Sequence, residues 1–232
     1  MLDVRDVRGV RDVIEKVRWT VLLFSRNLLL AGDPRESRRW VREVTEHVRS
    51  KTGREVSVWS AIAGAPIGTT AFTMLVESRA QLAAATQPLT DDDEYHDIVN
   101  RGRKFFSGPP EDRLVRYVHL AGEGDVQLAP VGSAVSLVSA QIATGKHLAA
   151  IRWGAEMADL QASISGGRVG FCVNVAGTFG GVQWIQTAPD IATQEAWEQR
   201  ILDDERYGEK LSEIGGMFVE GSGNRILARR VF

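Results

Sequence analysis

The sequence predicts an α+β protein made of two tandem copies of one strand–helix–strand–strand–helix–strand unit, with an amphipathic helix in front of them. Three observations support this fold class. The second half of the chain matches the first when the two are laid over each other. Each half carries strand-like and helix-like patterns in the same order. The residues before the first copy have an apolar period of their own.

The internal match is anchored by aromatic residues. Trp40 and Trp153 stand 113 positions apart, and several glycines coincide at the same offset. After a one-residue gap in a glycine-rich loop, Tyr95 and Tyr207 coincide at an offset of 112. Self-similarity at a fixed offset is the signature of a repeated structural unit. We therefore predict one repeat at 18–121, a linker at 122–131 and a second repeat at 132–232.

Residues 1–17 lie before both repeats and have no counterpart ahead of the second one. Apolar residues recur there every three to four positions, which is typical of an amphipathic helix: Val4, Val7, Val10, Ile14 and Val17. Such a helix either docks on its own barrel or pairs with another subunit. We predict that it serves in assembly.

The elements of each copy follow from their patterns. The first copy begins with an apolar run, and Trp40, Val44 and Val48 then lie at helical spacing. Its predicted strands are 19–30, 55–63, 69–77 and 113–120, and its helices are 34–50 and 91–106. The second copy repeats this order, with strands at 134–143, 168–176, 182–188 and 225–232 and helices at 146–163 and 194–218.

This order is the ferredoxin-like split pattern, in which an antiparallel sheet carries both helices on one face. The other face of each sheet must also be covered. By alternation it carries six residues: Trp59, Ala61, Ala63, Cys172, Asn174 and Ala176. Two half-covered sheets on one chain can close on each other. We therefore predict that the repeats pack as a pseudo-two-fold α/β barrel.

Composition excludes several classes of protein. The formal net charge of −2 gives no electrostatic reason to expect binding to nucleic acid or to an anionic membrane. A single cysteine, Cys172, excludes a disulfide within the chain and an all-cysteine zinc site. No run approaches the roughly 18 apolar residues of a membrane span. We expect a soluble, cytoplasmic protein without a transmembrane segment.

The acidic run at 91–94 favours a structural role. Its carboxylates could bind a divalent cation, but Thr90 or Asp91 can cap the helix that starts there, and Asp203–Asp204 repeats the pair. Of the four histidines, no two stand at the spacing of a metal motif, so no metal site is predicted. His47 and His147 are expected to face solvent.

The topology, together with Asp-Glu-Tyr-His at 93–96 at the start of the second helix, resembles the dimeric α/β-barrel superfamily. That group includes antibiotic-biosynthesis-type monooxygenases and the muconolactone-isomerase-like, NIPSNAP-like and chlorite-dismutase-like haem proteins. The resemblance implies a largely apolar pocket. In several of these proteins it also implies chemistry on planar organic substrates without a cofactor.

Tyr117 and His119 are the candidate catalytic residues, because residues two apart on a strand share a face. Inside a barrel they could form an acid–base pair, or His119 could be the axial ligand of a haem. The alternative is a hydrogen-bonded histidine without a catalytic role. The candidate ligand-binding residues are Trp59, Asn174, Gln183 and Trp184, with Asn174 or Gln183 orienting a substrate oxygen.

Two functions follow from these expectations. The first is a small-molecule-binding barrel that acts as a cofactor-independent monooxygenase or isomerase on a planar, apolar or aromatic substrate. A variant of this first function in which the barrel binds haem is ranked below the cofactor-independent enzyme. The second is a non-catalytic structural or assembly module, which forms homo-oligomers through residues 1–17 or through strand edges.

Overall fold

The computed structural model describes residues 21–232. The helix predicted at 1–17 lies outside the described residues, so its role in assembly stays a prediction. Within 21–232 no helix combines the length and the apolar character needed to cross a membrane.

The first half contains four strands and three α-helices. In chain order they are β1 (Leu22–Leu29), α2 (Pro34–Thr52), β2 (Ser57–Ala63), β3 (Thr69–Val76), α3 (Arg79–Thr86), α4 (Asp93–Gly102) and β4 (Glu111–Ala121). Two short 3-10 turns, Gln87–Leu89 and Arg103–Phe105, flank α4. Helix α3 was not predicted, since its eight residues, rich in alanine, have no apolar stripe.

The second half also contains four strands and three α-helices. Its elements are β5 (Ala134–Gln141), α5 (His147–Ser165), β6 (Val169–Ala176), β7 (Gly181–Ala188), α6 (Ile191–Asp203), α7 (Glu205–Ser212) and β8 (Asn224–Arg230). The single helix predicted at 194–218 is therefore two helices. Asp204 has an extended backbone and caps α7 through its side chain, which ends α6 one residue earlier.

All eight strands form one closed antiparallel barrel in the order β1-β3-β2-β8-β5-β7-β6-β4. Each half supplies four neighbouring strands, and the pairs β2–β8 and β4–β6 join the halves. The predicted α+β barrel is confirmed at this level. Assembly through strand edges is wrong for these strands, because closure pairs each of them on both sides.

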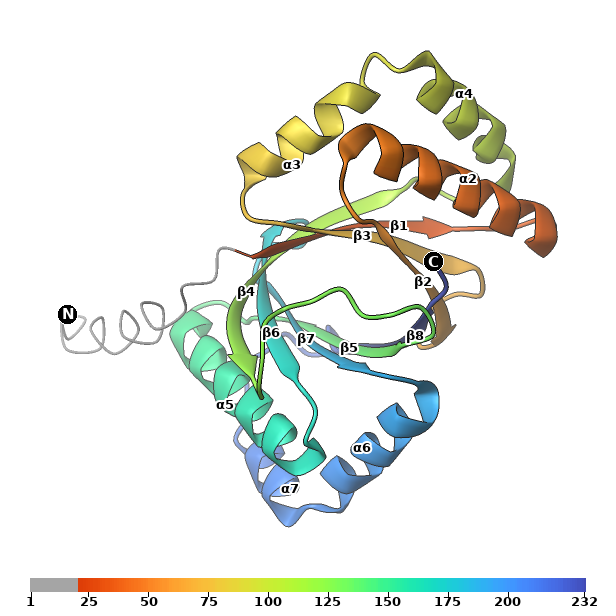
Figure 1. Cartoon of the computed structure of the whole chain (residues 1–232). Coiled ribbons are helices and arrows are strands. Elements are labelled where there is room, and N and C mark those ends of the chain that lie inside the picture. The colour runs from red at the N-terminus through yellow and green to blue at the C-terminus, as the bar shows by residue number, and fades with distance from the viewer. Residues whose placement is uncertain (1–20) are drawn as a thin grey trace.

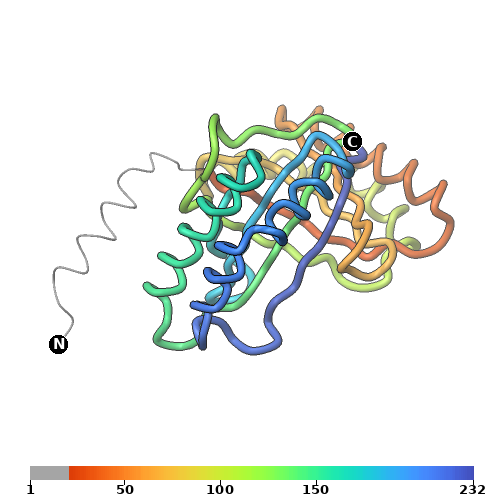
Figure 2. Tube along the Cα trace, turned by 90° about the horizontal axis from the view of Figure 1, so that it is seen from below, coloured from red at the N-terminus to blue at the C-terminus, as the bar shows by residue number. Residues whose placement is uncertain are grey.

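Helices cover the barrel on two opposite sides (Figure 1). Helices α2, α3 and α4 lie over the strands of the first half, and α5, α6 and α7 lie over those of the second. Seen from below, α5 and α6 run side by side across the strands (Figure 2).

The paired tryptophans fix the long helices to the structure around them. Trp40 on α2 and Trp153 on α5 are both buried, as predicted. The indole nitrogen of Trp40 donates to the carbonyl of Ile98, 2.8 Å away, and that of Trp153 donates to the carbonyl of Lys210 at 3.0 Å. Each tryptophan therefore joins its long helix to a second helix of the same half, α4 or α7, as well as to the sheet.

Candidate functional site

The inside of the barrel holds a cavity of about 400 Å³. Every strand except β6 contributes to its walls, through the residues that alternate inward. Aliphatic and small side chains form most of the surface: Leu23, Ala61, Ala71, Leu75, Val115, Val135, Leu137, Ile185, Ile226 and Ala228. Polar side chains are spread among them: Ser25, Asn27, Thr69, Thr73, Glu111, Arg113, Gln183, Thr187 and Asn224. A volume of this size lies in the range of small-molecule sites.

The segment predicted as a plain linker forms part of the wall. Between β4 and β5 the chain crosses the barrel (Figure 1), and residues 126–129 line the cavity. Sequence reasoning missed this role because the polar and glycine residues at 122–125 resemble an ordinary connection. A signal was present in Val126 and Leu128, which are apolar and two apart.

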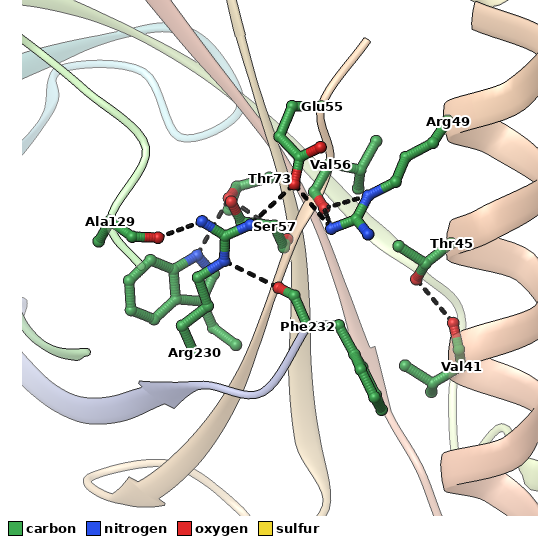
Figure 3. A network of polar contacts seen from close by, with 11 residues as sticks. Val41, Thr45, Arg49, Glu55, Val56, Ser57, Thr73, Ala129, Arg230 and Phe232 are labelled. Atoms are coloured by element: carbon green, nitrogen blue, oxygen red, sulfur yellow. Dashed lines mark hydrogen bonds and ion pairs between the residues drawn. The ribbon is translucent and has the colours of Figure 1, made fainter. Parts of the chain in front are cut away.

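Arg230 on β8 holds this segment in place. Its side chain is buried, and its guanidinium donates to the carbonyl of Ala129, to the carbonyl of Phe232 at 2.9 Å and to the carboxylate of Glu55 at 2.8 Å (Figure 3). Arg49 on α2 pairs with the same carboxylate at 2.8 Å. The network therefore links the crossing segment, the C-terminus and a helix of the first half.

Tyr117 lies in the cavity wall, as predicted. Its ring rests on Gly170 of β6, where an added Cβ would come within 2.4 Å of the ring. Burial raises the pKa of the Tyr117 hydroxyl well above its ordinary value. The hydroxyl therefore stays protonated at neutral pH and suits donation of a hydrogen bond to a ligand better than removal of a proton.

His119 does not face the cavity with Tyr117, contrary to the prediction. A β-bulge separates the two residues, so that Tyr117 pairs with Cys172 while His119 pairs with the adjacent Phe171. The bulge turns the His119 ring to the outer face, where its Nε2 lies 2.7 Å from the carboxylate of Asp159 on α5. Alternation along a strand predicts a shared face only when no extra residue interrupts the ladder. A catalytic role of Tyr117 and His119 together stays a prediction.

The structure brings Trp59 and Gln183 to the cavity wall. The indole nitrogen of Trp59 donates to the Thr73 hydroxyl at 3.1 Å. The Gln183 amide donates to the Asn174 side chain at 3.4 Å, and Asn174 in turn donates to the carbonyl of Thr178 at 3.0 Å. Asn174 therefore stabilises the β6–β7 turn and lies behind Gln183 rather than in the wall.

Trp184 is placed differently from the prediction. It lies on the outer face of β7, where its ring packs against Trp153, Phe171 and Phe218 at centroid distances of 5.0–5.9 Å. Its indole nitrogen donates to the carbonyl of Gly154 on α5 at 2.9 Å. Trp184 therefore belongs to the core between helix and sheet, because its neighbour Gln183 takes the inward position.

The acidic run at the start of α4 forms a cluster on the outside of the barrel. Asp92, and not Thr90 or Asp91, caps the helix. Its carboxylate lies 2.9 Å from Nε2 of His47 and 3.1 Å from the ammonium of Lys51, and the His47 side chain is buried rather than solvated. Burial raises the pKa of Asp92, but hydrogen bonds from His47 and Lys51 outweigh it and hold the pKa at about 2.

His47, Asp92 and Glu94 bring three ligand atoms within 4.8 Å of one another, so they could in principle hold a metal ion. The Lys51 ammonium competes for the same Asp92 oxygen. The helix cap, the hydrogen bond between His47 and Asp92, and the ion pair of Asp92 with Lys51 therefore account for the cluster without a metal.

A haem does not fit the residues of this structure. The residues that line the cavity include no His, Met or Cys among the part of the chain described, and the Tyr117 hydroxyl stays protonated. The layer between α5 and the sheet is filled by Trp153, Phe171 and Trp184. His119 would have to leave Asp159 to ligate a metal, so we derive no chemistry through a haem.

Solved structures of other proteins share this fold. A candidate monooxygenase from Fusobacterium nucleatum superposes with a TM-score of 0.66 at 8% identity, over 93% of this chain and 94% of the other. An anthrone oxidase-like protein reaches 0.67 at 13% identity, over 91% and 92%. A mutant chlorite dismutase from Candidatus Nitrospira defluvii reaches 0.53 at 8% identity, over 96% and 95%.

No known family model matches the sequence, and no curated protein resembles it significantly. The structural neighbours include candidate monooxygenases, an anthrone oxidase-like protein, chlorite dismutases and a regulator of staphylococcal pathogenesis, and at these identities they establish the fold alone.

Proposed function

We propose that the chain binds a planar, largely apolar organic molecule inside its barrel and oxidises it with molecular oxygen without a cofactor. The cavity carries this proposal: its walls are mainly aliphatic, Trp59 offers a flat surface, and Tyr117 and Gln183 add hydrogen-bond donors to the wall. The anthrone oxidase-like neighbour suggests anthrone as a probe of the substrate class.

The reaction can be written without an added reductant. Anthrone loses a proton from its central methylene carbon, and the resulting carbanion reduces oxygen and combines with it to give a hydroperoxide. Loss of water then gives anthraquinone, so that one anthrone and one oxygen molecule yield one quinone and one water. The Tyr117 hydroxyl and the Gln183 amide would donate hydrogen bonds to the oxygen of the carbanion. Glu111, the only carboxylate among the described lining residues, lies at the exposed start of β4 and away from Tyr117, so the methylene proton passes to water.

The experiment measures oxygen uptake and anthraquinone formation with the purified protein. We expect the two to rise in a one-to-one ratio above the rate without protein. Replacing Tyr117 with Phe should lower kcat by about tenfold to a thousandfold, in line with the loss of one donor to a developing oxyanion. No turnover by a protein that binds anthrone would leave only the ligand-holding function.

Occupation of the cavity is tested by filling it. Ala71 lies in the wall, and Ala71→Phe should abolish binding of anthrone while the barrel stays folded. Ala84 lies exposed on α3, so Ala84→Phe is the matched control and should bind anthrone normally. Equal binding by both variants would place the ligand elsewhere.

The second candidate function is a non-catalytic ligand-holding module. The observation in its favour is that the polar lining residues are scattered, with Glu111 at one end of the barrel and Tyr117 nearer the other. It predicts tight binding of apolar ligands with no oxygen uptake.

We also propose that the barrel arose by duplication of one ferredoxin-like unit. Contacts that match between the halves support it: the isolated bridges Leu30–Phe106 and Ile142–Phe218 have the same geometry at an offset of 112. Superposition of 21–121 on 134–232 tests it, and Trp40 should then fall on Trp153.

A further inference from the structure

Two hairpin tips each present one large apolar side chain to solvent. Ile67 in the β2–β3 turn is 99% exposed, and Phe179 in the β6–β7 turn is 95% exposed. The two residues stand 112 positions apart, which is the offset at which the halves match. Single exposed apolar residues are ordinary on a protein surface. Nearly complete exposure of a large side chain at both matched tips has no explanation in the packing of the barrel.

Both tips lie at the same end of the barrel. Going around the sheet, the end of β1 pairs with the start of β3, and Asn27 near that end pairs with Glu111 at the start of β4. Near its start β4 meets the end of β6, which leads through the turn into β7. The Cα partners that fix this rim are Leu29–Thr69, Asn27–Glu111, Leu114–Ala176 and Gln141–Gly181.

The cavity reaches this rim. Gly64, Ala65 and Pro66 of the first tip line it, as do Pro109 and Glu111 at the start of β4. The Glu111 side chain is largely exposed, so the lining continues to solvent there. At the other end of the barrel the segment 126–129 crosses the cavity under the hold of Arg230. The two exposed side chains therefore flank the more accessible end of the cavity.

We infer that this rim docks on an electrically neutral phospholipid surface, with Ile67 and Phe179 inserted and the cavity facing the lipid. The inference goes beyond the proposed function, since docking requires no catalysis. It gives an apolar ligand a route from the lipid into the barrel. Charges of both signs stand on the rim, for example Glu111 and Lys146, so no preference for anionic lipid is expected.

A second copy of the chain is the competing occupant, and the shape of the rim argues against it. A stable protein interface needs a continuous surface of roughly 800 Å² on each partner. Here the two nearly fully exposed apolar side chains stand on separate glycine-bounded turns, the other exposed apolar residues near the rim (Ile62, Leu148 and Val219) are about half covered, and charged residues such as Glu111 and Lys146 interrupt the surface. A hydrated headgroup layer accepts such charges while the apolar tips reach deeper.

The test is flotation of the full chain with phosphatidylcholine vesicles at increasing lipid. We expect the wild type to float, Ile67→Ser and Phe179→Ser each to weaken binding, and the double variant to lose about tenfold in apparent partition. Val131 is 64% exposed and precedes β5 at the opposite end of the barrel, so Val131→Ser is the matched control and should float as the wild type does. Raising the salt to about 1 M should leave flotation unchanged, because charges are screened within ~3 Å there.

Several results would overturn the inference: a wild type that does not float, a double variant that floats normally, or an equal loss in Val131→Ser. A wild-type dimer that the double variant makes monomeric, with no flotation of either, would assign the rim to contact between copies. Binding of anthrone in vesicle-free solution separates this inference from the proposed function. Flotation without anthrone binding defeats only the latter, and anthrone binding without flotation defeats only the former.

Discussion

At the scale of single residues, Arg230 shows how much of the cavity depends on one side chain. A buried guanidinium is tolerated only when its donors are matched. Here two backbone carbonyls and the Glu55 carboxylate match them, and the Ala129 carbonyl belongs to the segment that crosses the cavity. Removing the guanidinium would leave the Ala129 carbonyl without its donor, whereas the Phe232 carbonyl still accepts from the backbone N–H of Val58 at 3.0 Å.

Arg230→Met should therefore lower the free energy of unfolding by about 1–3 kcal/mol, because it leaves one acceptor, the Ala129 carbonyl, unmet, at a cost of roughly 1–3 kcal/mol. Chemical denaturation measures this loss. Arg229 is exposed on the same strand, and Arg229→Met should change stability by less than about 0.5 kcal/mol. Equal effects of both substitutions would show that the network around Arg230 contributes little.

Asp92 predicts a dependence of stability on pH. Its pKa falls from an ordinary value of 3.8 to about 2 in the folded protein. A carboxyl group whose pKa is lowered by folding stabilises the fold above its unfolded-state pKa, and this contribution is lost as the pH falls through the folded value. Asp92→Asn should therefore be less stable than the wild type at pH 7, and the difference should shrink between about pH 4 and pH 2.

The comparison uses unfolding free energies at several pH values. Asn can still cap α4, so the variant removes the charge and leaves the cap. Asp93→Asn, one position further into the helix, is the control for the loss of a helix-terminal charge. A difference between Asp92→Asn and the wild type that does not vary with pH would contradict the pairing with His47 and Lys51.

At the scale of elements, the helices are fixed by aromatic residues whose polar atoms are also satisfied. Both Trp40 and Trp153 combine a large buried surface with a hydrogen bond to a neighbouring helical segment. Gly102 and Gly154 leave the room that this packing needs. A Cβ at Gly102 would come within 2.1 Å of Trp40, and one at Gly154 within 2.3 Å of Phe171.

Replacing either tryptophan with Ala should cost about 3–5 kcal/mol, as large-to-small substitutions in a core do. Thermal and chemical unfolding report the loss. Leu202 on α6 is exposed, and Leu202→Ala should leave stability nearly unchanged. If both tryptophan variants had the same unfolding midpoint as the wild type, these helices would be held by other contacts.

Elements with a strong period were predictable, and those defined by a local irregularity were not. Trp40, Val44 and Val48 repeat at helical spacing, so the helix found at Pro34–Thr52 was predicted to within two residues. The bulge after Tyr117 leaves no trace in the alternation, so His119 was placed on the wrong face. Gln183 faces the cavity, so its neighbour Trp184 faces the opposite side of β7 and packs in the core beneath α5, which the sequence did not predict.

At the scale of the whole molecule, every strand of the closed barrel pairs with two neighbouring strands. Closure gives each half a cover for its open sheet face and creates the cavity at the same time. The sequence predicted that two sheets would close, because Trp59 and Ala61 needed cover. It did not predict that the connection between the halves would cross the barrel, since that depends on Arg230, which lies about a hundred residues away in the chain.

The last strand makes this dependence testable. Strand β8 pairs with β2 of the first half on one side and with β5 of its own half on the other. The pairing of β8 with β2 is one of the two that join the halves. Truncation after Asn224 would remove Arg230, expose the apolar side chains around Ala228 and leave backbone groups of both neighbours unpaired. Unmet buried groups cost roughly 1–3 kcal/mol each, against a total stability of about 5–15 kcal/mol.

We therefore expect the truncated chain to be insoluble or to lack a cooperative unfolding transition, while a polar tail appended after Phe232 leaves the transition intact. A soluble truncated chain that still unfolds cooperatively and binds anthrone would show that β8 is dispensable, and the closed barrel would then not be what forms the cavity.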